Sequence, residues 1–197
     1  MRRVLAATAT LLCLAVFSAV LPSPARAQGP PGADTLLALQ RAAMAKLSFM
    51  DGVWRGPAWT IVAGGIKHSV TQTERIGPFL GGAVKVIEGR GYDDKDSVTF
   101  NAFGIVSYDP MKKGHTLHSY AMGMAGDFVF MPADSGYSWE IPAGPVTIRY
   151  SAVVRRGKWH EIGERVVPGG DAVQFFEMNL VRVGDTTWPG AGVIPPR

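Results

Sequence analysis

Turn residues divide most of the chain into short, evenly spaced segments. After Gly52, glycines or prolines recur every 8–12 residues, and β-branched and aromatic runs lie between them. This spacing is typical of an antiparallel sandwich or barrel. We predict ten strands, at 53–62, 67–76, 82–92, 97–108, 115–123, 126–131, 136–141, 145–154, 158–167 and 172–183.

The connections between these strands are short, which predicts an up-and-down order. Closing the sheet into a barrel removes the two exposed edges that would otherwise invite aggregation. One amphipathic helix precedes the strands, because apolar residues between Asp34 and Leu47 recur at steps of three and four. We therefore predict an all-β fold, a single antiparallel barrel over residues 34–184, with this helix capping one end.

A barrel embedded in an outer membrane is an alternative with the same strand count. Its strands would alternate apolar and polar side chains and carry aromatic residues toward lipid. The predicted strand 67–76, KHSVTQTERI, is polar on both faces, so it does not suit a lipid-facing wall.

Residues 1–27 have the pattern of a secretory signal peptide. Arg2 and Arg3 precede an uncharged apolar run, and Ala25-Arg26-Ala27 places small residues where signal peptidase cleaves. We predict cleavage after Ala27, a periplasmic or secreted protein, and no membrane span in the mature form. The apolar run is also about long enough to be an uncleaved anchor, but two prolines follow it.

The remaining residues limit the classes of function. Residues 28–33 are a predicted linker and 185–197 a proline-rich tail. Residues 28–197 hold 17 basic and 16 acidic side chains, a net charge of +1, which argues against nucleic acid as a partner. The single cysteine, Cys13, lies in the signal segment, so the mature chain has no disulfide, thiol nucleophile or cysteine-based metal site.

Six segments in order resemble one family of bacterial proteins. They are LSFMDGVWRG (47–56), FLGG (79–82), GIVSYDP (104–110), TLHSY (116–120), KWHEIGER (158–165) and FFEMNLVR (175–182). The order and content of these six segments resemble those of the uncharacterised DUF1579 family. The resemblance implies a calycin-like or lipocalin-like barrel with a ligand-sized cavity. It implies no catalytic residue, and it places Trp54 as a structural residue across the barrel base.

Candidate site residues come from the late strands. Strand 158–167 carries charged residues on both of its faces, so some of them must point into a wet or ligand-lined interior. One face holds Trp159, Glu161, Gly163 and Arg165, and the other holds His160, Ile162, Glu164 and Val166. A buried charge needs a partner. We consider the pairs Glu161 with Arg165 and Glu177 with Arg149, or ordinary surface pairs.

Glu177 is a lone carboxylate in an apolar stretch, and the sequence leaves its orientation open. Facing inward, it would have a raised pKa and serve as a general acid or base, or bind a ligand head group. His118 and Tyr120 fall on one face of strand 115–123 and complete the candidate ligand-binding set of His118, Tyr120, Arg149, Glu161, Arg165 and Glu177.

The sequence contains only weak indications of a cofactor site or a catalytic site. Nitrobindin-like barrels bind haem through one histidine, so His118 or His160 is a candidate axial ligand. The four histidines have no zinc-motif spacing, and the order of Ser, His and Asp residues suggests no triad.

Three functions remain as hypotheses. The first is a barrel that holds a small apolar or amphipathic molecule. The second is a hydrolase or isomerase whose cavity uses Glu177 or Glu161 with His118. The third is a cell-envelope protein that binds through its outer surface, which exposed aromatics in one patch would favour.

Overall fold

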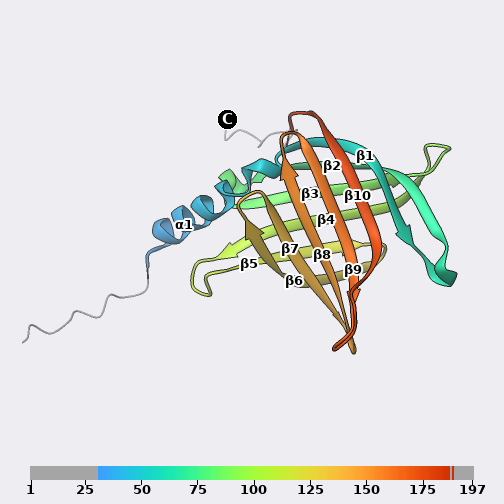
Figure 1. Cartoon of the computed structure of the whole chain (residues 1–197). Coiled ribbons are helices and arrows are strands. Elements are labelled where there is room, and N and C mark those ends of the chain that lie inside the picture. The colour runs from blue at the N-terminus through green and yellow to red at the C-terminus, as the bar shows by residue number, and fades with distance from the viewer. Residues whose placement is uncertain (1–30, 187, 189–197) are drawn as a thin grey trace, which may run out of the picture. The chain divides into compact units, whose positions relative to one another are not determined.

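Ten antiparallel strands form one closed barrel in the computed structural model, which describes residues 31–186 and 188. Each strand pairs with the next along the chain, and β1 pairs with β10 to close the ring (Figure 1). The predicted up-and-down barrel is confirmed, and no predicted strand end is more than three residues from the observed one. The strands are β1 (Gly52–Ile61), β2 (Lys67–Phe79), β3 (Val84–Tyr92), β4 (Val98–Asp109), β5 (Gly114–Ala121), β6 (Met124–Ala133), β7 (Gly136–Ala143), β8 (Val146–Arg155), β9 (Lys158–Val166) and β10 (Val173–Gly184).

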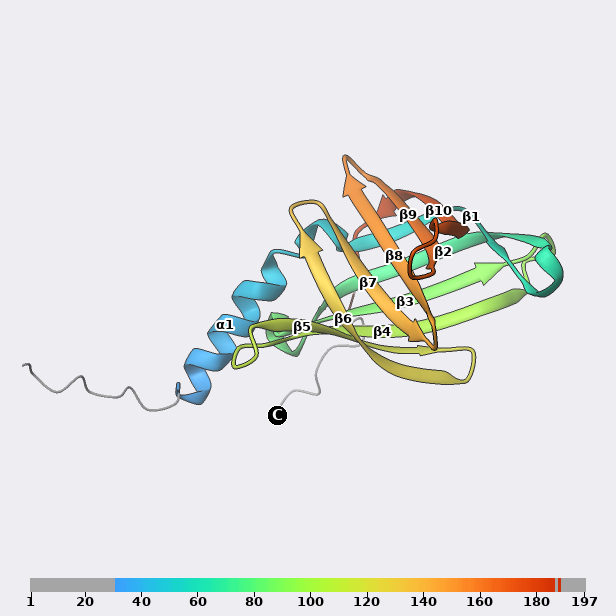
Figure 2. The ribbon, with the colours of Figure 1, turned by 60° about the horizontal axis from the view of Figure 1, so that its bottom comes forward.

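The predicted N-terminal helix is α1 (Ala33–Ala45), and it extends from one end of the barrel (Figure 2). Its only buried residue is Met44, and Gln40 Nε2 donates to the Tyr108 carbonyl oxygen at 3.3 Å. The residues that follow the helix close this end of the barrel, and we call residues 47–50 the plug. Leu47, and Met50 in the short 3₁₀ helix η1 (Ser48–Met50), are both 0% exposed. We call this closed end the base.

The opposite end of the barrel carries the turns that leave β1, β3, β5, β7 and β9. Two further 3₁₀ helices lie in connections, η2 (Ala63–Gly65) at this end and η3 (Leu80–Gly82) at the base. Side chains alternate between the inside and the outside of the wall along every strand. The half of the interior next to these turns is called the open half below.

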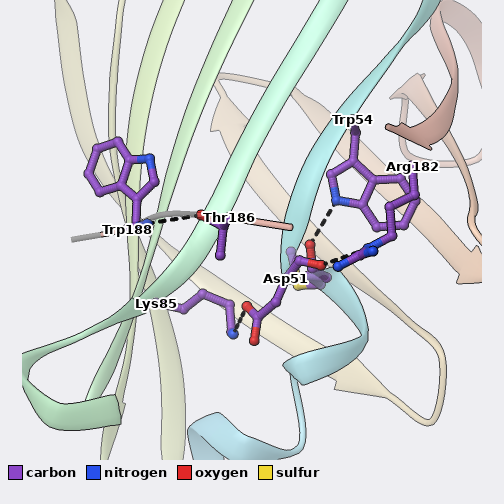
Figure 3. A network of polar contacts seen from close by, with 7 residues as sticks. Asp51, Trp54, Lys85, Arg182, Thr186 and Trp188 are labelled. Carbon is purple, nitrogen blue, oxygen red and sulfur yellow. Dashed lines mark hydrogen bonds and ion pairs between the residues drawn. The ribbon is translucent and has the colours of Figure 1, made fainter. Parts of the chain in front are cut away.

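Trp54 is the central side chain of the base. It is 1% exposed, and its indole Nε1 donates to the Met50 carbonyl oxygen at 2.9 Å (Figure 3). Its ring meets the ring of Trp159 edge to face, with centroids 5.6 Å apart. The structural role that the sequence suggested for Trp54 is confirmed, since the indole links the plug to two strands of the wall.

A buried ion pair lies beside this indole. The Lys85 ammonium, whose side chain is 3% exposed, pairs with the Asp51 carboxylate (Figure 3). Arg182 Nε also donates to the Asp51 backbone carbonyl at 3.3 Å. These contacts join β3, the start of β1 and the end of β10 at the base.

The start of the predicted tail lies on the outer wall. Trp188 packs against Phe79 and Phe103, with centroid distances of 6.3 and 6.2 Å. A Cβ at Gly77 would come within 3.0 Å of Thr186 and Trp188, so the glycine allows this close approach. The predicted signal segment and the end of the tail lie outside the described residues. Within the described part of the chain, no helix is long and apolar enough to cross a membrane.

The ion pair at the base gives a stability prediction. Asp51→Ala leaves the Lys85 ammonium buried without a partner, so we expect the free energy of unfolding to fall by about 3 kcal/mol, the lower end for a buried pair because Asp51 is partly exposed. The double variant Asp51→Ala, Lys85→Met should recover at least half of that loss, because it removes the unpaired charge. Urea unfolding of both variants tests this, and equal stability of the single variant and the wild type would contradict it.

Candidate functional site

Two carboxyl groups are buried in the middle of the barrel. Glu74 of β2 is 8% exposed and Glu161 of β9 is 7% exposed. Their strand partners explain why both face inward: Glu74 lies opposite Trp54, and Glu161 lies opposite Met178, itself a core residue. Side chains opposite one another on paired strands share one face of the sheet.

Each carboxyl group accepts one short hydrogen bond. Gln72 Nε2 donates to Glu74 Oε1 at 2.7 Å, and the Tyr137 hydroxyl donates to Glu161 Oε2 at 2.6 Å. A glycine makes room for the first of these groups. A Cβ at Gly89 would come within 2.7 Å of Glu74 Oε1, so any larger residue there would displace the carboxyl group.

Burial strongly changes the proton affinity of both groups. Loss of solvent raises the pKa of Glu74 from 4.5 to about 8, and the charge of Glu161 raises it further against the opposing hydrogen bond from Gln72. Burial likewise raises the pKa of Glu161 from 4.5 to about 7, with the Tyr137 hydrogen bond as the main opposing effect. Near neutral pH each of these buried carboxyl groups is therefore only partly ionised.

Neither carboxyl group has a cationic partner among the described residues. The inward-facing Lys85 is paired with Asp51 at the base. Arg165, at the open end of β9, is exposed and lies 5.2 Å from the Phe175 ring centroid. A buried carboxyl group without a cation is costly unless it holds a proton or binds a ligand that supplies one.

One buried donor near this pair is also unsatisfied. The Trp159 side chain is 2% exposed, and its Nε1 has no hydrogen-bond partner. The indole lies close enough to Glu161 and to the Tyr137 hydroxyl to lower the pKa of both groups. The site thus contains donor and acceptor capacity that the protein does not use internally.

A band of four aromatic rings covers the wall above the carboxyl groups. Trp139 stacks on Tyr150 with centroids 4.4 Å apart and planes 8° from parallel. Phe128 lies 5.4 Å from Trp139, and Phe176 lies 5.7 Å from Tyr150. We call Phe128, Trp139, Tyr150 and Phe176 the aromatic band; its members come from β6, β7, β8 and β10.

Burial differs between the two halves of the interior. Core residues near the base, such as Ile76 and Val106, are 0% exposed. The four residues of the aromatic band are only partly buried, and the inward-facing Phe100 is 36% exposed. Solvent therefore reaches the inner wall of the open half, and the two carboxyl groups lie where this accessible wall meets the packed base.

An apolar groove lies at the rim of the open half, beside the turn between β5 and β6. Its volume is about 420 Å³, and Ala102, Phe103, Tyr120, Met122 and Met124 are among its lining residues. Three of these, Tyr120, Met122 and Met124, are more than half exposed. The groove offers apolar surface next to the mouth of the barrel.

Of the six predicted ligand-binding residues, only Glu161 is buried in the interior. Arg165 lies at the open end, away from Glu161, so their predicted pair is absent. Glu177 is on the outer face, where it accepts hydrogen bonds from Trp59 Nε1 at 3.0 Å and is 3.0 Å from His160 Nε2. Hydrogen bonding lowers the pKa of Glu177, whereas an inward position would have raised it.

The other three predicted residues also lie outside. Arg149 Nε donates to Glu140 at 2.8 Å, so the predicted pair of Arg149 with Glu177 is absent too. Tyr120 is 54% exposed on the rim groove. His118 is on the outer face, so a haem inside the barrel would reach neither His118 nor His160. No three His, Cys, Asp or Glu side chains within residues 31–186 and 188 are grouped to hold a metal ion.

His118 belongs instead to a hydrogen-bonded chain that the sequence order did not suggest. Its Nδ1 is 2.7 Å from Asp127 Oδ1, and its Nε2 is 3.1 Å from Ser107 Oγ. The three residues come from neighbouring strands of the outer wall. The order resembles a hydrolytic triad, but β4 pairs with strands on both sides of Ser107, so the ladder occupies the backbone N–H groups an oxyanion would need.

Glu74 is the site residue that sequence reasoning missed. Segment 67–76 carries polar residues on both faces, and this composition hides the alternation that places Gln72, Glu74 and Ile76 on one face. A signal was present, because the apolar Ile76 at the end of the segment indicates the buried side, and Glu74 lies two residues before it.

Comparisons with known proteins support the fold. No family model and no curated protein matches the chain. The solved structures that match include an S-type phycobiliprotein lyase from Guillardia theta, with a TM-score of 0.50 and 11% sequence identity over 76% of this chain and 98% of that one. At this identity the likeness shows the fold alone.

The two raised pKa values predict an unusual pH dependence of stability. Between about pH 5 and pH 8 the folded chain holds more protons on Glu74 and Glu161 than the unfolded chain, so the free energy of unfolding falls as pH rises. We expect a loss of at least about 2 kcal/mol over this range, since one pKa unit corresponds to about 1.4 kcal/mol. Urea unfolding at several pH values measures it.

The control for this prediction is a variant that removes both titrations. Glu74→Gln, Glu161→Gln should have a flatter profile, whereas Glu164→Gln, on the outer face of the same strand as Glu161, should keep the slope of the wild type. A wild-type profile that rises from pH 5 to pH 8 would contradict the assignment.

Proposed function

We propose that this chain is an exported barrel that binds a small, largely apolar molecule in the open half of its interior. One observation carries the proposal: partly exposed aromatic rings cover an inner wall that ends at two buried carboxyl groups, neither of which has a cationic partner among the described residues. Binding sites for small molecules commonly combine apolar walls with a few polar groups that fix orientation. The barrel shared with a phycobiliprotein lyase supports the proposal at the level of fold.

Export and family membership are part of the same proposal. The predicted signal segment and the lack of cysteine beyond residue 13 suit a periplasmic carrier that relies on its core for stability. The sequence resemblance to the DUF1579 family adds the expectation of a ligand-sized cavity. In this proposal the apolar rim groove lies beside the path by which an apolar ligand enters.

An enzymatic role is the second candidate, and the raised pKa values of Glu74 and Glu161 favour it. Carboxyl groups that titrate near neutral pH suit general acid–base catalysis. The pair of Glu177 and His118, which the sequence suggests, does not suit such a cavity because both side chains lie on the outer wall. Turnover that is lost in Glu74→Gln or Glu161→Gln, while ligand binding persists, would favour this candidate.

The carrier proposal predicts binding of a neutral apolar dye inside the barrel. N-phenylnaphthylamine should show enhanced, blue-shifted fluorescence with residues 28–197, and Ser119→Trp should weaken that binding about tenfold. Ser119 faces inward between Gly104 and Gly126, so an indole there would fill the mouth of the open half.

Val129→Trp provides the matched control, because Val129 is 69% exposed on the outer face of the neighbouring strand. This variant should bind the dye as the wild type does. Equal dye affinity of Ser119→Trp and the wild type would show that the dye binds elsewhere and would overturn the proposed site.

A further inference from the structure

We propose that the ligand of this barrel is an organic cation, an ammonium or protonated nitrogen heterocycle joined to an apolar group. The inference rests on the proposed function, because it names the chemistry of the molecule bound in the open half. It follows from the charges and the free hydrogen-bonding capacity of the groups at the floor of that half.

The floor offers more acceptors than the protein uses. Glu74 and Glu161 each accept one short hydrogen bond from a side chain, from Gln72 and Tyr137 respectively, while an ionised carboxylate has about four lone-pair positions. A ligand that donates N–H groups would fill the remaining positions. A carboxylate or phosphate ligand would instead meet two acidic groups that have no cationic partner in the described part of the chain.

The aromatic walls of the site also favour a positively charged ligand. Trp139 and Tyr150 present a stacked pair of rings, and Phe128 and Phe176 extend the aromatic band on either side. Aromatic faces attract ammonium groups, most strongly where water is excluded. The outer wall shows the same attraction at Trp59, where Lys67 Nζ lies 4.2 Å from the ring centroid.

The buried Trp159 indole is a second sign that a ligand or water belongs here. Its Nε1 is unpartnered and close to Glu161 and Tyr137, although the side chain is 2% exposed. Three donors, from Tyr137, Trp139 and Trp159, lie near Glu161 and favour its ionised form. They oppose the larger effect of burial, which keeps the pKa of Glu161 raised to about 7, so a cation meets the ionised carboxylate chiefly above that pH.

The groups that face the pair do not neutralise it. Tyr137 and Tyr150 are held neutral, since burial and the nearby Glu161 raise the pKa of each above its ordinary value. Three further charged groups lie around the pair. Glu88 is on the outer face of β3 and is ion-paired with Arg90. Lys85 is paired with Asp51 at the base, and Arg165 lies at the mouth.

Cation binding should displace protons. Near neutral pH both carboxyl groups of the empty site are partly protonated, and an arriving ammonium replaces these protons as the balancing positive charge. Affinity for a cation should therefore rise with pH between about 6 and 8.5, while affinity for a neutral ligand of the same shape should change little.

The test uses three probes of one shape and different charge: phenylbutylamine, phenylbutanol and phenylbutyrate. Isothermal titration calorimetry of residues 28–197 near pH 8.5 should give the order amine, alcohol, carboxylate, with the amine about tenfold tighter than the alcohol. Titrations near pH 7.5 in buffers of different ionisation enthalpy should show about one proton released with the amine and none with the alcohol.

Variants separate charge recognition from folding. Glu74→Gln, Glu161→Gln should bind amine and alcohol with equal affinity, so retained alcohol binding reports an intact barrel. Glu164→Gln removes a carboxylate from the outer face of β9 and should keep the preference of the wild type.

The outcomes distinguish this inference from the function on which it rests. Alcohol binding as tight as amine binding, or release of no proton, would overturn the cation proposal and leave a neutral-ligand barrel. Failure of all three probes and of the naphthylamine dye would overturn the proposed function itself. A preference for the amine that survives in the double variant would place cation binding outside the barrel and overturn the inference.

Discussion

The position of Trp54 at the base sets the inside of the barrel. Its indole is held by the Met50 carbonyl and the Trp159 ring, so this position of β1 must face inward. Cross-strand pairing then places Glu74 inside, because it lies directly opposite Trp54. A shift of one residue in this register would turn Glu74 to solvent and bring its neighbours Thr73 and Arg75 to the interior.

The same register buries two carboxyl groups, and their ionisation lowers the stability of the barrel. Two buried carboxyl groups that have no cationic partner within residues 31–186 destabilise the empty protein as they ionise, and apolar residues of similar size would remove that penalty. The base shows the contrasting solution, where Lys85 is paired with Asp51. Unbalanced polar groups beside a partly exposed aromatic wall are therefore best explained by a ligand that balances them.

The sequence predicted the fold well and the site poorly, for physical reasons. Gly and Pro spacing marks turns locally, so the ten strands and their order were recoverable, and the role of Trp54 followed from its motif. The inward faces were not recoverable in the same way, because Glu177 in an apolar stretch and Glu74 in a polar one gave misleading local context. Pairing with distant strands decides which face of each strand points inward. The same pairing brings Glu74 close enough to Glu161 for the charge of Glu161 to raise the pKa of Glu74.

The protonation of the two buried carboxyl groups tests this account most directly. Carbon-detected NMR of residues 28–197 with labelled glutamate side chains would follow each carboxyl resonance with pH, and the Glu74→Gln and Glu161→Gln variants would assign them. The account predicts that the resonances lost in these variants have midpoints of about 8 and about 7. Midpoints of about 4.5 for both, as for solvent-exposed carboxyl groups, would contradict it.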